Sequence, residues 1–136
     1  MVLDTNVVSF LFKRDTRAEW YRPHLTGKLL VISFMTVAEL DCWVLERNWG
    51  EKRRSRMEEH LRNFVVYPFA RALCVKWAEV TNRARRNGRP IQCADAWIAA
   101  TAVLHSIPLV TNNGKDYRFT NSGTSGLIHL CRPRAH

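Results

Sequence analysis

Four acidic residues from distant parts of the chain lie beside apolar runs, where a carboxylate is unexpected: Asp4, Glu39, Asp95 and Asp116. An ionised group in apolar surroundings is costly unless a partner compensates its charge. A divalent cation held by converging carboxylates is one such partner, and it can activate water for hydrolysis. We therefore ask whether the chain is built to bring these four side chains together.

Each acid also has a simpler interpretation as a local structural residue. Asp4 suits the N-cap of a following helix. Glu39 lies three residues after Thr36, the spacing of a capping box. Asp95 falls in the first turn of a predicted helix, where the helix dipole favours a negative charge, and Asp116 suits a turn. These roles explain the acids one by one, but they do not explain why the acids should gather.

Apolar periodicity and turn residues predict strands that alternate with helices along the chain. The predicted strands span residues 2–3, 29–33, 64–67, 108–111 and 127–130. The predicted helices span residues 5–12, 16–25, 36–49, 51–63, 70–87 and 93–106, with Gly50 and Gly88 as stops. This alternation favours an α/β fold with helices on both faces of a parallel sheet. Sites in such folds lie at the carboxyl ends of the strands, which Asp4 and residues 111–116 follow.

The size of the chain and its charge constrain its organisation and its partners. At 136 residues we expect one domain, residues 1–136, and the 21 Lys and Arg against 12 acids give a net charge of +9. Such an excess suits a phosphate backbone, so we expect a nucleic-acid partner. The basic residues form three groups: Lys13, Arg14, Arg17 and Arg22; Arg47, Lys52, Arg53, Arg54, Arg56 and Arg62; and Arg83, Arg85, Arg86 and Arg89.

Cysteine usage and hydropathy predict the compartment. The four cysteines form no C-x-x-C pair, and the five histidines show no metal-ligand spacing, so we expect buried free thiols and no structural zinc. The N-terminus lacks the pattern of a secretory signal, and no apolar run is long enough to span a membrane. These features predict a cytoplasmic protein.

Four segments, in order, resemble the motifs of PIN-domain nucleases. Leu3-Asp-Thr-Asn6 resembles the opening motif, and Ser33-Phe-Met-Thr-Val-Ala-Glu-Leu40 resembles the second. The segment of residues 88–100 is similar to the third motif, and that of residues 109–117 to the fourth. The chain length is similar to that of VapC-type toxins. The resemblance implies a three-layer α/β/α fold around a parallel sheet of about five strands.

The resemblance also implies the site and its chemistry. Asp4, Glu39 and Asp95 take the positions of catalytic, metal-binding acids, with Mg²⁺ or Mn²⁺ as the cofactor. For the fourth position we favour Asp116, with Asn113 as its rival. The implied activity is endoribonuclease cleavage that leaves a 5′-phosphate and a 3′-hydroxyl.

The remaining matched positions are polar, and the implied partners are macromolecules. Asn6, Thr111 and Asn113 take positions that orient the acids or the substrate. Tyr117 replaces the Phe that is commoner in the family. A cognate antitoxin, an RNA substrate and a second copy of the chain, in a homodimer, are the implied partners.

Two other functions compete with this interpretation. The uncertain fourth acid is compatible with a catalytically silent RNA- or protein-binding module on the same fold. A phosphoryl-transfer domain with Asp4 as nucleophile also places a carboxylate after a strand. That class requires a further acid close to Asp4 in the sequence, and the chain does not provide one.

Overall fold

The computed structural model describes residues 1–114, 117 and 129–131. Five parallel strands form one sheet in the order β3-β2-β1-β4-β5. The strands are β1 (Val2–Leu3), β2 (Val31–Ser33), β3 (Val65–Tyr67), β4 (Leu109–Thr111) and β5 (His129–Cys131). The predicted α/β class with about five parallel strands is confirmed. The first two residues of the predicted strand 127–130 lie outside the described residues.

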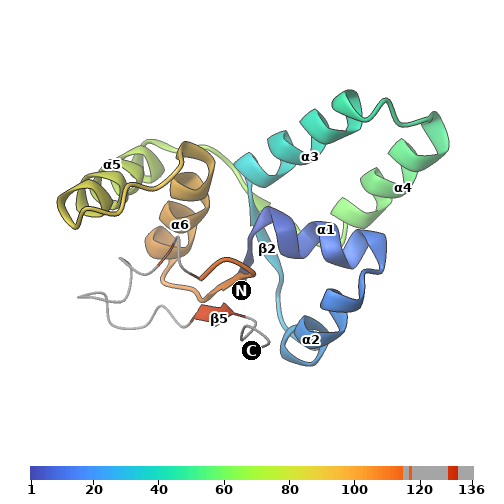
Figure 1. Ribbon diagram of the computed structural model, residues 1–136, viewed down its shortest axis with the longest axis horizontal. Helices are drawn as coiled ribbons and strands as arrows, with labels where there is room; N and C mark the ends of the chain where they lie inside the picture. The colour runs from blue at the N-terminus through green and yellow to red at the C-terminus, as the bar shows by residue number, and fades with distance from the viewer. Residues whose placement is uncertain (115–116, 118–128, 132–136) are drawn as a thin grey trace.

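Helices pack on both faces of the sheet (Figure 1). They are α1 (Thr5–Lys13), α2 (Thr16–Leu25), α3 (Phe34–Glu46), α4 (Glu51–Leu61), α5 (Arg71–Arg86) and α6 (Cys93–His105). Each predicted helix is present, and most differences at the ends are of one or two residues. Gly88 follows α5 with a φ of 67°, a left-handed conformation that suits a residue without a Cβ.

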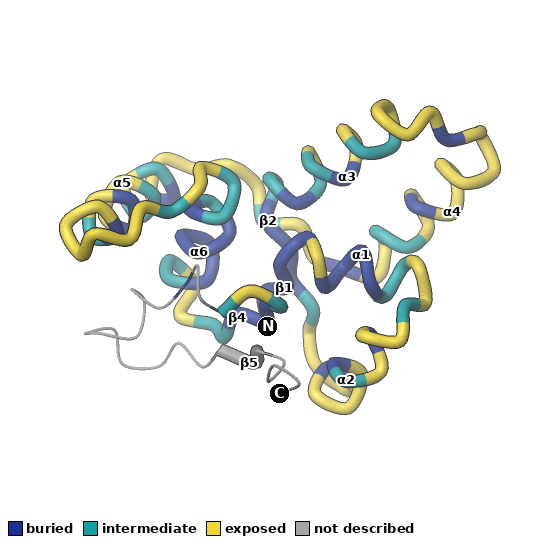
Figure 2. The backbone as a smooth tube through the Cα atoms, viewed as in Figure 1, coloured by how far each residue is buried: buried dark blue, intermediate teal, exposed yellow. Residues whose placement is uncertain are grey.

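The central strands divide the core into two layers because successive strand side chains point to opposite faces. One layer contacts α1 to α4 and contains Leu3, Ile32 and Val110. The other contacts α5 and α6 and contains Val2, Val31 and Leu109. Figure 2 shows these central segments as the buried part of the chain. Strands buried on both faces explain the continuous apolar runs in the sequence.

Helix α3 corrects two predictions about local structure. It begins at Phe34, with Ser33 as the N-cap whose side chain accepts a hydrogen bond from the Met35 amide at 3.1 Å. The Thr36–Glu39 capping box is therefore wrong, and Glu39 lies in the second turn. The helix ends at Glu46 rather than at residue 49, and Gly50 is instead the N-cap of α4.

The prediction of buried thiols is also wrong for two cysteines. Cys42 and Cys93 are exposed free thiols on α3 and α6, and Cys74 is half-buried. The apolar composition of α3 and α6 did not indicate which face of each helix is exposed, and both thiols lie on exposed faces.

Within the described residues, no helix is both long and apolar enough to cross a lipid bilayer.

Candidate active site

Asp4 occupies the junction of β1 and α1, and both of its carboxylate oxygens are held. Its backbone amide donates to the Val110 carbonyl at 3.0 Å, which continues the pairing of β1 with β4. Oδ1 accepts from the Val7 amide at 2.9 Å and so caps α1. Oδ2 accepts from the hydroxyl of Thr111, at the end of β4. The predicted capping role is correct, and it uses only one of the two oxygens.

Burial changes the acidity of this carboxyl. Asp4 is only 4% exposed, and burial raises its pKa from 3.8 to about 6. Hydrogen bonds from the Thr111 side chain and from the Val7 and Asn112 amides act in the opposite direction, and the charge of Asp95 raises the pKa further. Asp4 therefore carries a charge at neutral pH in a setting that opposes it, and a nearby cation would stabilise that charge.

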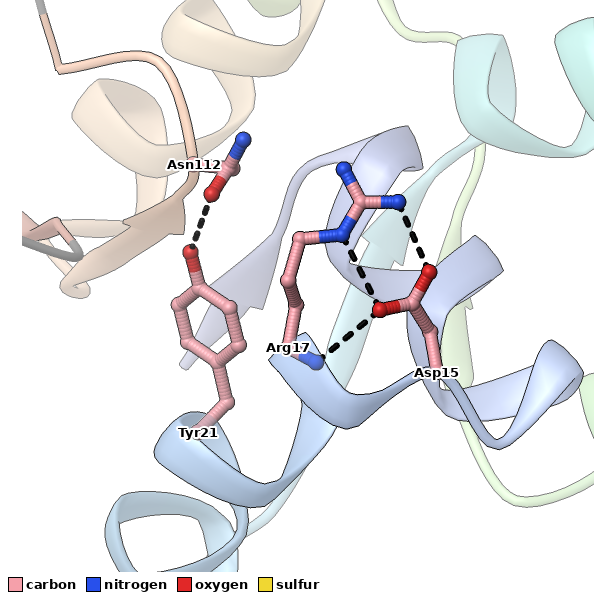
Figure 3. A network of polar contacts seen from close by, with 4 residues as sticks. All are labelled: Asp15, Arg17, Tyr21 and Asn112. Atoms are coloured by element: carbon pink, nitrogen blue, oxygen red, sulfur yellow. Dashed lines mark hydrogen bonds and ion pairs between the residues drawn. The ribbon is translucent and has the colours of Figure 1, made fainter. Parts of the chain in front are cut away.

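A hydrogen bond from helix α2 stabilises the turn after β4. The Thr111 hydroxyl accepts from the Asn113 amide at 3.0 Å. The hydroxyl of Tyr21, a fully buried residue of α2, donates to the Asn112 side-chain oxygen at 3.1 Å (Figure 3). Asp15 caps the same helix and binds Arg17 through both oxygens. Tyr21 thus fixes the segment whose backbone and side chains contact Asp4.

Glu39 is tied to the helix that Asp4 caps. The Thr5 hydroxyl lies 2.7 Å from Glu39 Oε1 and 3.1 Å from Thr36 Oγ1. A hydroxyl has one proton, which the carboxylate attracts more strongly, so Thr5 donates to Glu39 and accepts from Thr36. Glu39 is half-buried and comes from α3, so this contact joins the second motif to the first.

Asp95 lies in the first turn of α6, as predicted, and is half-buried. The Tyr117 hydroxyl donates to Asp95 Oδ1 at 3.2 Å, and this Tyr is almost fully buried. Tyr117, which replaces the commoner Phe, therefore supplies Asp95 with a hydrogen-bond donor that Phe would lack.

Comparisons with known proteins identify the family. The PIN-domain family model matches residues 1–121. The chain belongs to the PIN-domain family. It is 34% identical to the VapC ribonuclease Y4jK of Sinorhizobium fredii over 83% of this chain and 86% of that protein. It is 32% identical to Ribonuclease VapC1 of Haemophilus influenzae, covering 86% and 89% of the two chains.

The structure of VapBC-1 from nontypeable Haemophilus influenzae is similar to this PIN domain. The TM-score is 0.78 at 27% identity, and the match covers 96% of each chain. The resemblance to VapC-type ribonucleases that the sequence predicted is confirmed, together with its fold.

The structure brings some of the predicted residues of the PIN domain together. Asp4 and Thr111 are in contact, Asn113 binds Thr111 through its amide, and Asp95 acts on Asp4 through its charge. Glu39 joins this group indirectly, through Thr5. Asn6 is exposed on α1, and its side chain forms no hydrogen bond with the described part of the chain.

Two observations concern the metal that the family implies. Asp116 lies outside the described residues, and in the remainder no three His, Cys, Asp or Glu side chains form a group that could hold a metal ion. The donor chemistry nevertheless fits a hard cation, because Asp4, Asp95 and Glu39 offer only carboxylate oxygens. Burial and the charge of Asp95 raise the pKa of Asp4, and a cation bound at this position would lower it again.

Sequence reasoning missed three residues that position this site: Thr5, Tyr21 and Asn112. Thr5 and Asn112 lie inside the motif segments, directly beside Asp4 and Thr111, so their position was a usable signal. Tyr21 is 91 residues from its partner Asn112, and nothing in the sequence indicated that contact.

Proposed function

We propose that residues 1–136 act as one PIN domain that cleaves RNA internally with Mg²⁺ or Mn²⁺, as the toxin of a toxin–antitoxin pair in the cytoplasm. The observation that carries the proposal is the buried Asp4 carboxylate, whose oxygens are oriented by Val7 and Thr111 while the charge of Asp95 acts on it. The VapC ribonucleases that the chain resembles support RNA as the substrate.

The metal would be held by Asp4, Asp95 and Glu39, with Asp116 as the fourth carboxylate and Asn113 as its rival. When bound, such an ion polarises water and the scissile phosphate for hydrolysis. The chain supplies orientation. Because capping fixes one Asp4 oxygen and Thr111 fixes the other, this carboxylate cannot rotate away. Tyr117 donates to one oxygen of Asp95 and so favours one orientation of that carboxylate.

Two protein partners belong to the proposal. One similar solved structure is that of VapBC-1 from nontypeable Haemophilus influenzae, and the VapC-type resemblance implies a cognate antitoxin for this chain as well. An antitoxin that covers the carboxylates would block access of RNA to them.

An exposed apolar surface supports the proposed homodimer. Strand β3 is at the edge of the sheet, and its Val65 and Val66 are 41% and 42% exposed. Phe69 and Val75, next along the chain, are 62% and 44% exposed. Exposed apolar residues on and beside an edge strand are common where a protein pairs with another chain. A Phe69→Asp variant that remains dimeric by light scattering would contradict a dimer through this surface.

The catalytic assignment is tested by RNA cleavage with purified protein. We expect cleavage with Mg²⁺ or Mn²⁺, none with chelator, and losses of more than about 100-fold in Asp4→Asn and Asp95→Asn. Asp41→Asn is a matched control, because Asp41 is an exposed acid on α3 close to Glu39. Metal-independent RNA binding without cleavage would instead support the silent binding module, and full activity in Asp4→Asn would exclude Asp4 from the site.

A further inference from the structure

Cationic side chains from α1, from α4 and from the residue after α3 lie over aromatic rings, at the opposite end of α1 from Asp4. Lys13, the last residue of α1, has Nζ 6.0 Å from the centre of the Trp43 ring, and Arg47 has Cζ 5.3 Å from the same ring. Arg53 of α4 lies over Trp49, with Cζ 4.0 Å from the ring centre. α1, α3 and α4 therefore share one cationic surface, which we call the Lys13 cluster: Lys13, Arg47 and Arg53.

The aromatic rings give this cluster a fixed framework. Trp49 is 7% exposed and stacks on Phe12 with ring centres 5.6 Å apart. Arg56 extends the surface, with Cζ 5.9 Å from the Phe12 ring centre. A cation over a ring face is held by the ring quadrupole, and a guanidinium placed in this way keeps N–H donors at its edge. The arginines are thus restrained before any ligand binds.

The charges of the cluster repel one another without a matching set of acids. Desolvation lowers the pKa of Lys13, and the charges of Arg47, Arg53 and Arg17 lower it further. Asp15 opposes this effect, but Asp15 is already bound by Arg17. None of the ion pairs between described residues includes Lys13, Arg47, Arg53 or Arg56. Restrained like charges without counter-charges are a binding site for an anion.

We propose that the Lys13 cluster binds the phosphate backbone of the RNA substrate at a distance from the scissile bond. The inference rests on the proposed ribonuclease function for its choice of ligand. Helix α1 connects the two places, since Asp4 caps its start and Lys13 is its last residue. Nine helical residues span roughly 14 Å, so one RNA strand of a few nucleotides can reach both.

The covered ring faces favour a polyanion over an amphipathic protein segment. The cations lie over Trp43 and Trp49, so the cluster presents charge and N–H donors outward rather than apolar area. Phosphate oxygens match guanidinium edges in pairs, and each phosphate contact releases counterions. RNA bound here would position a strand across the acids without reading its sequence.

The test compares two double variants of equal charge in an Asp95→Asn background that prevents cleavage. Arg47→Ala/Arg53→Ala removes the cluster. Arg85→Ala/Arg86→Ala removes two exposed arginines from the end of α5, on the other side of the molecule from α4 (Figure 1). The probe is a fluorescein-labelled, 20-nucleotide single-stranded RNA, measured by anisotropy from 50 to 200 mM KCl. We expect the cluster variant to bind about 10-fold more weakly than the α5 variant, with a salt slope smaller by about 0.7 for each lost phosphate contact.

Equal affinity and equal salt slope in the two variants would overturn the proposal, even if the wild-type protein cleaves RNA. A second probe, a labelled poly-glutamate peptide, separates the other class of ligand: loss of peptide binding with unchanged RNA binding assigns the cluster to an acidic protein. If the alanine variants unfold, Arg47→Gln/Arg53→Gln keeps side-chain stems over the rings. Failure of the wild type to cleave any RNA would contradict the proposed function, whereas the binding comparison would still decide the role of the cluster.

Discussion

The Thr111 hydroxyl donates to Asp4 Oδ2 across the β1–β4 pair, while the other oxygen of Asp4 caps α1. The end of β4 and the start of α1 are therefore joined through one buried carboxylate. Neither residue can shift without disturbing the other, because Thr111 is fully buried and its hydroxyl also accepts from the Asn113 amide. Strand register, helix capping and the candidate active site depend on the same contact.

Removal of this hydroxyl should change both stability and metal requirement. In Thr111→Val the pKa of Asp4 should rise above its value of about 6, because the largest effect that lowers it is lost. We expect the free energy of unfolding to fall by about 2 kcal/mol. The Mg²⁺ concentration for half-maximal cleavage should rise roughly 10-fold. Thr111→Ser keeps the hydroxyl and serves as the control. Equal Mg²⁺ requirements in the Val and Ser variants would contradict this role of Thr111.

The raised pKa of Asp4 predicts how metal-free stability depends on pH. Burial raises the pKa from 3.8 to about 6, so the folded state binds the Asp4 proton more tightly than the unfolded chain does. This contribution is present below pH 3.8 and is lost as the pH rises through about 6, with a total on the order of 3 kcal/mol. Mg²⁺ should restore stability above pH 6, where the carboxylate is ionised.

The measurement must separate the effect of Asp4 on the pH dependence of stability from the effect of His60. Burial lowers the pKa of His60, so its contribution has the opposite sign and is lost as the pH falls below 6.5. Denaturant unfolding of wild type and Asp4→Asn between pH 4 and 7, with chelator present, isolates the contribution of Asp4 to the free energy of unfolding as their difference. Asn also caps helices well, so α1 should persist in the variant. The assigned shift is wrong if the difference does not change with pH.

Tyr21 should stabilise the turn after β4 from outside the motifs. Tyr21→Phe removes only the hydroxyl that donates to Asn112, and the free energy of unfolding should fall by about 1 kcal/mol. The control is Tyr67→Phe, since the hydroxyl of this half-buried Tyr forms no hydrogen bond with the described residues. Thermal unfolding together with the cleavage rate of each variant checks the prediction. A loss as large in Tyr67→Phe would show a general effect of hydroxyl removal.

The sequence predicted the elements of this fold because strand and helix periods are local signals. The buried runs at Val31 and Leu109 and the amphipathic pattern of α5 are visible without tertiary information. The sequence also predicted where Asp4 and Asp95 lie, because Asp4 caps the predicted helix α1 and Asp95 is in the first turn of the predicted helix α6. The start of α3 did not follow, because Ser33 and Thr36 are both acceptable caps and only tertiary packing selects between them.

Contacts between remote segments could not be predicted from the chain alone. The Tyr21–Asn112 bond and the contact of Lys13 with the Trp43 ring require the orientation of whole helices. Local pattern also failed at the surface, where Cys42 lies in an apolar helix yet is exposed. Apolar composition indicates that a helix packs, but it does not indicate which face of that helix packs.

The correction at α3 leads to a prediction that separates structure from chemistry. Ser33 caps the helix, whereas Thr5 donates to Glu39. Ser33→Ala should therefore lower the free energy of unfolding by about 1 kcal/mol with little change in the cleavage rate of folded protein. Thr5→Val should lower the cleavage rate roughly 10-fold because Glu39 loses the donor that orients it, while α3 keeps its cap.

Circular dichroism and single-turnover cleavage measure the two properties on the same samples. Thr5→Ser retains a hydroxyl at this position and should retain most of the rate, which distinguishes a lost hydrogen bond from a lost side-chain shape. A Thr36–Glu39 capping box would give a different pattern, with Thr36→Ala as the main destabilising change and Thr5→Val without effect on the rate. That result would contradict the role of Thr5 in orienting Glu39.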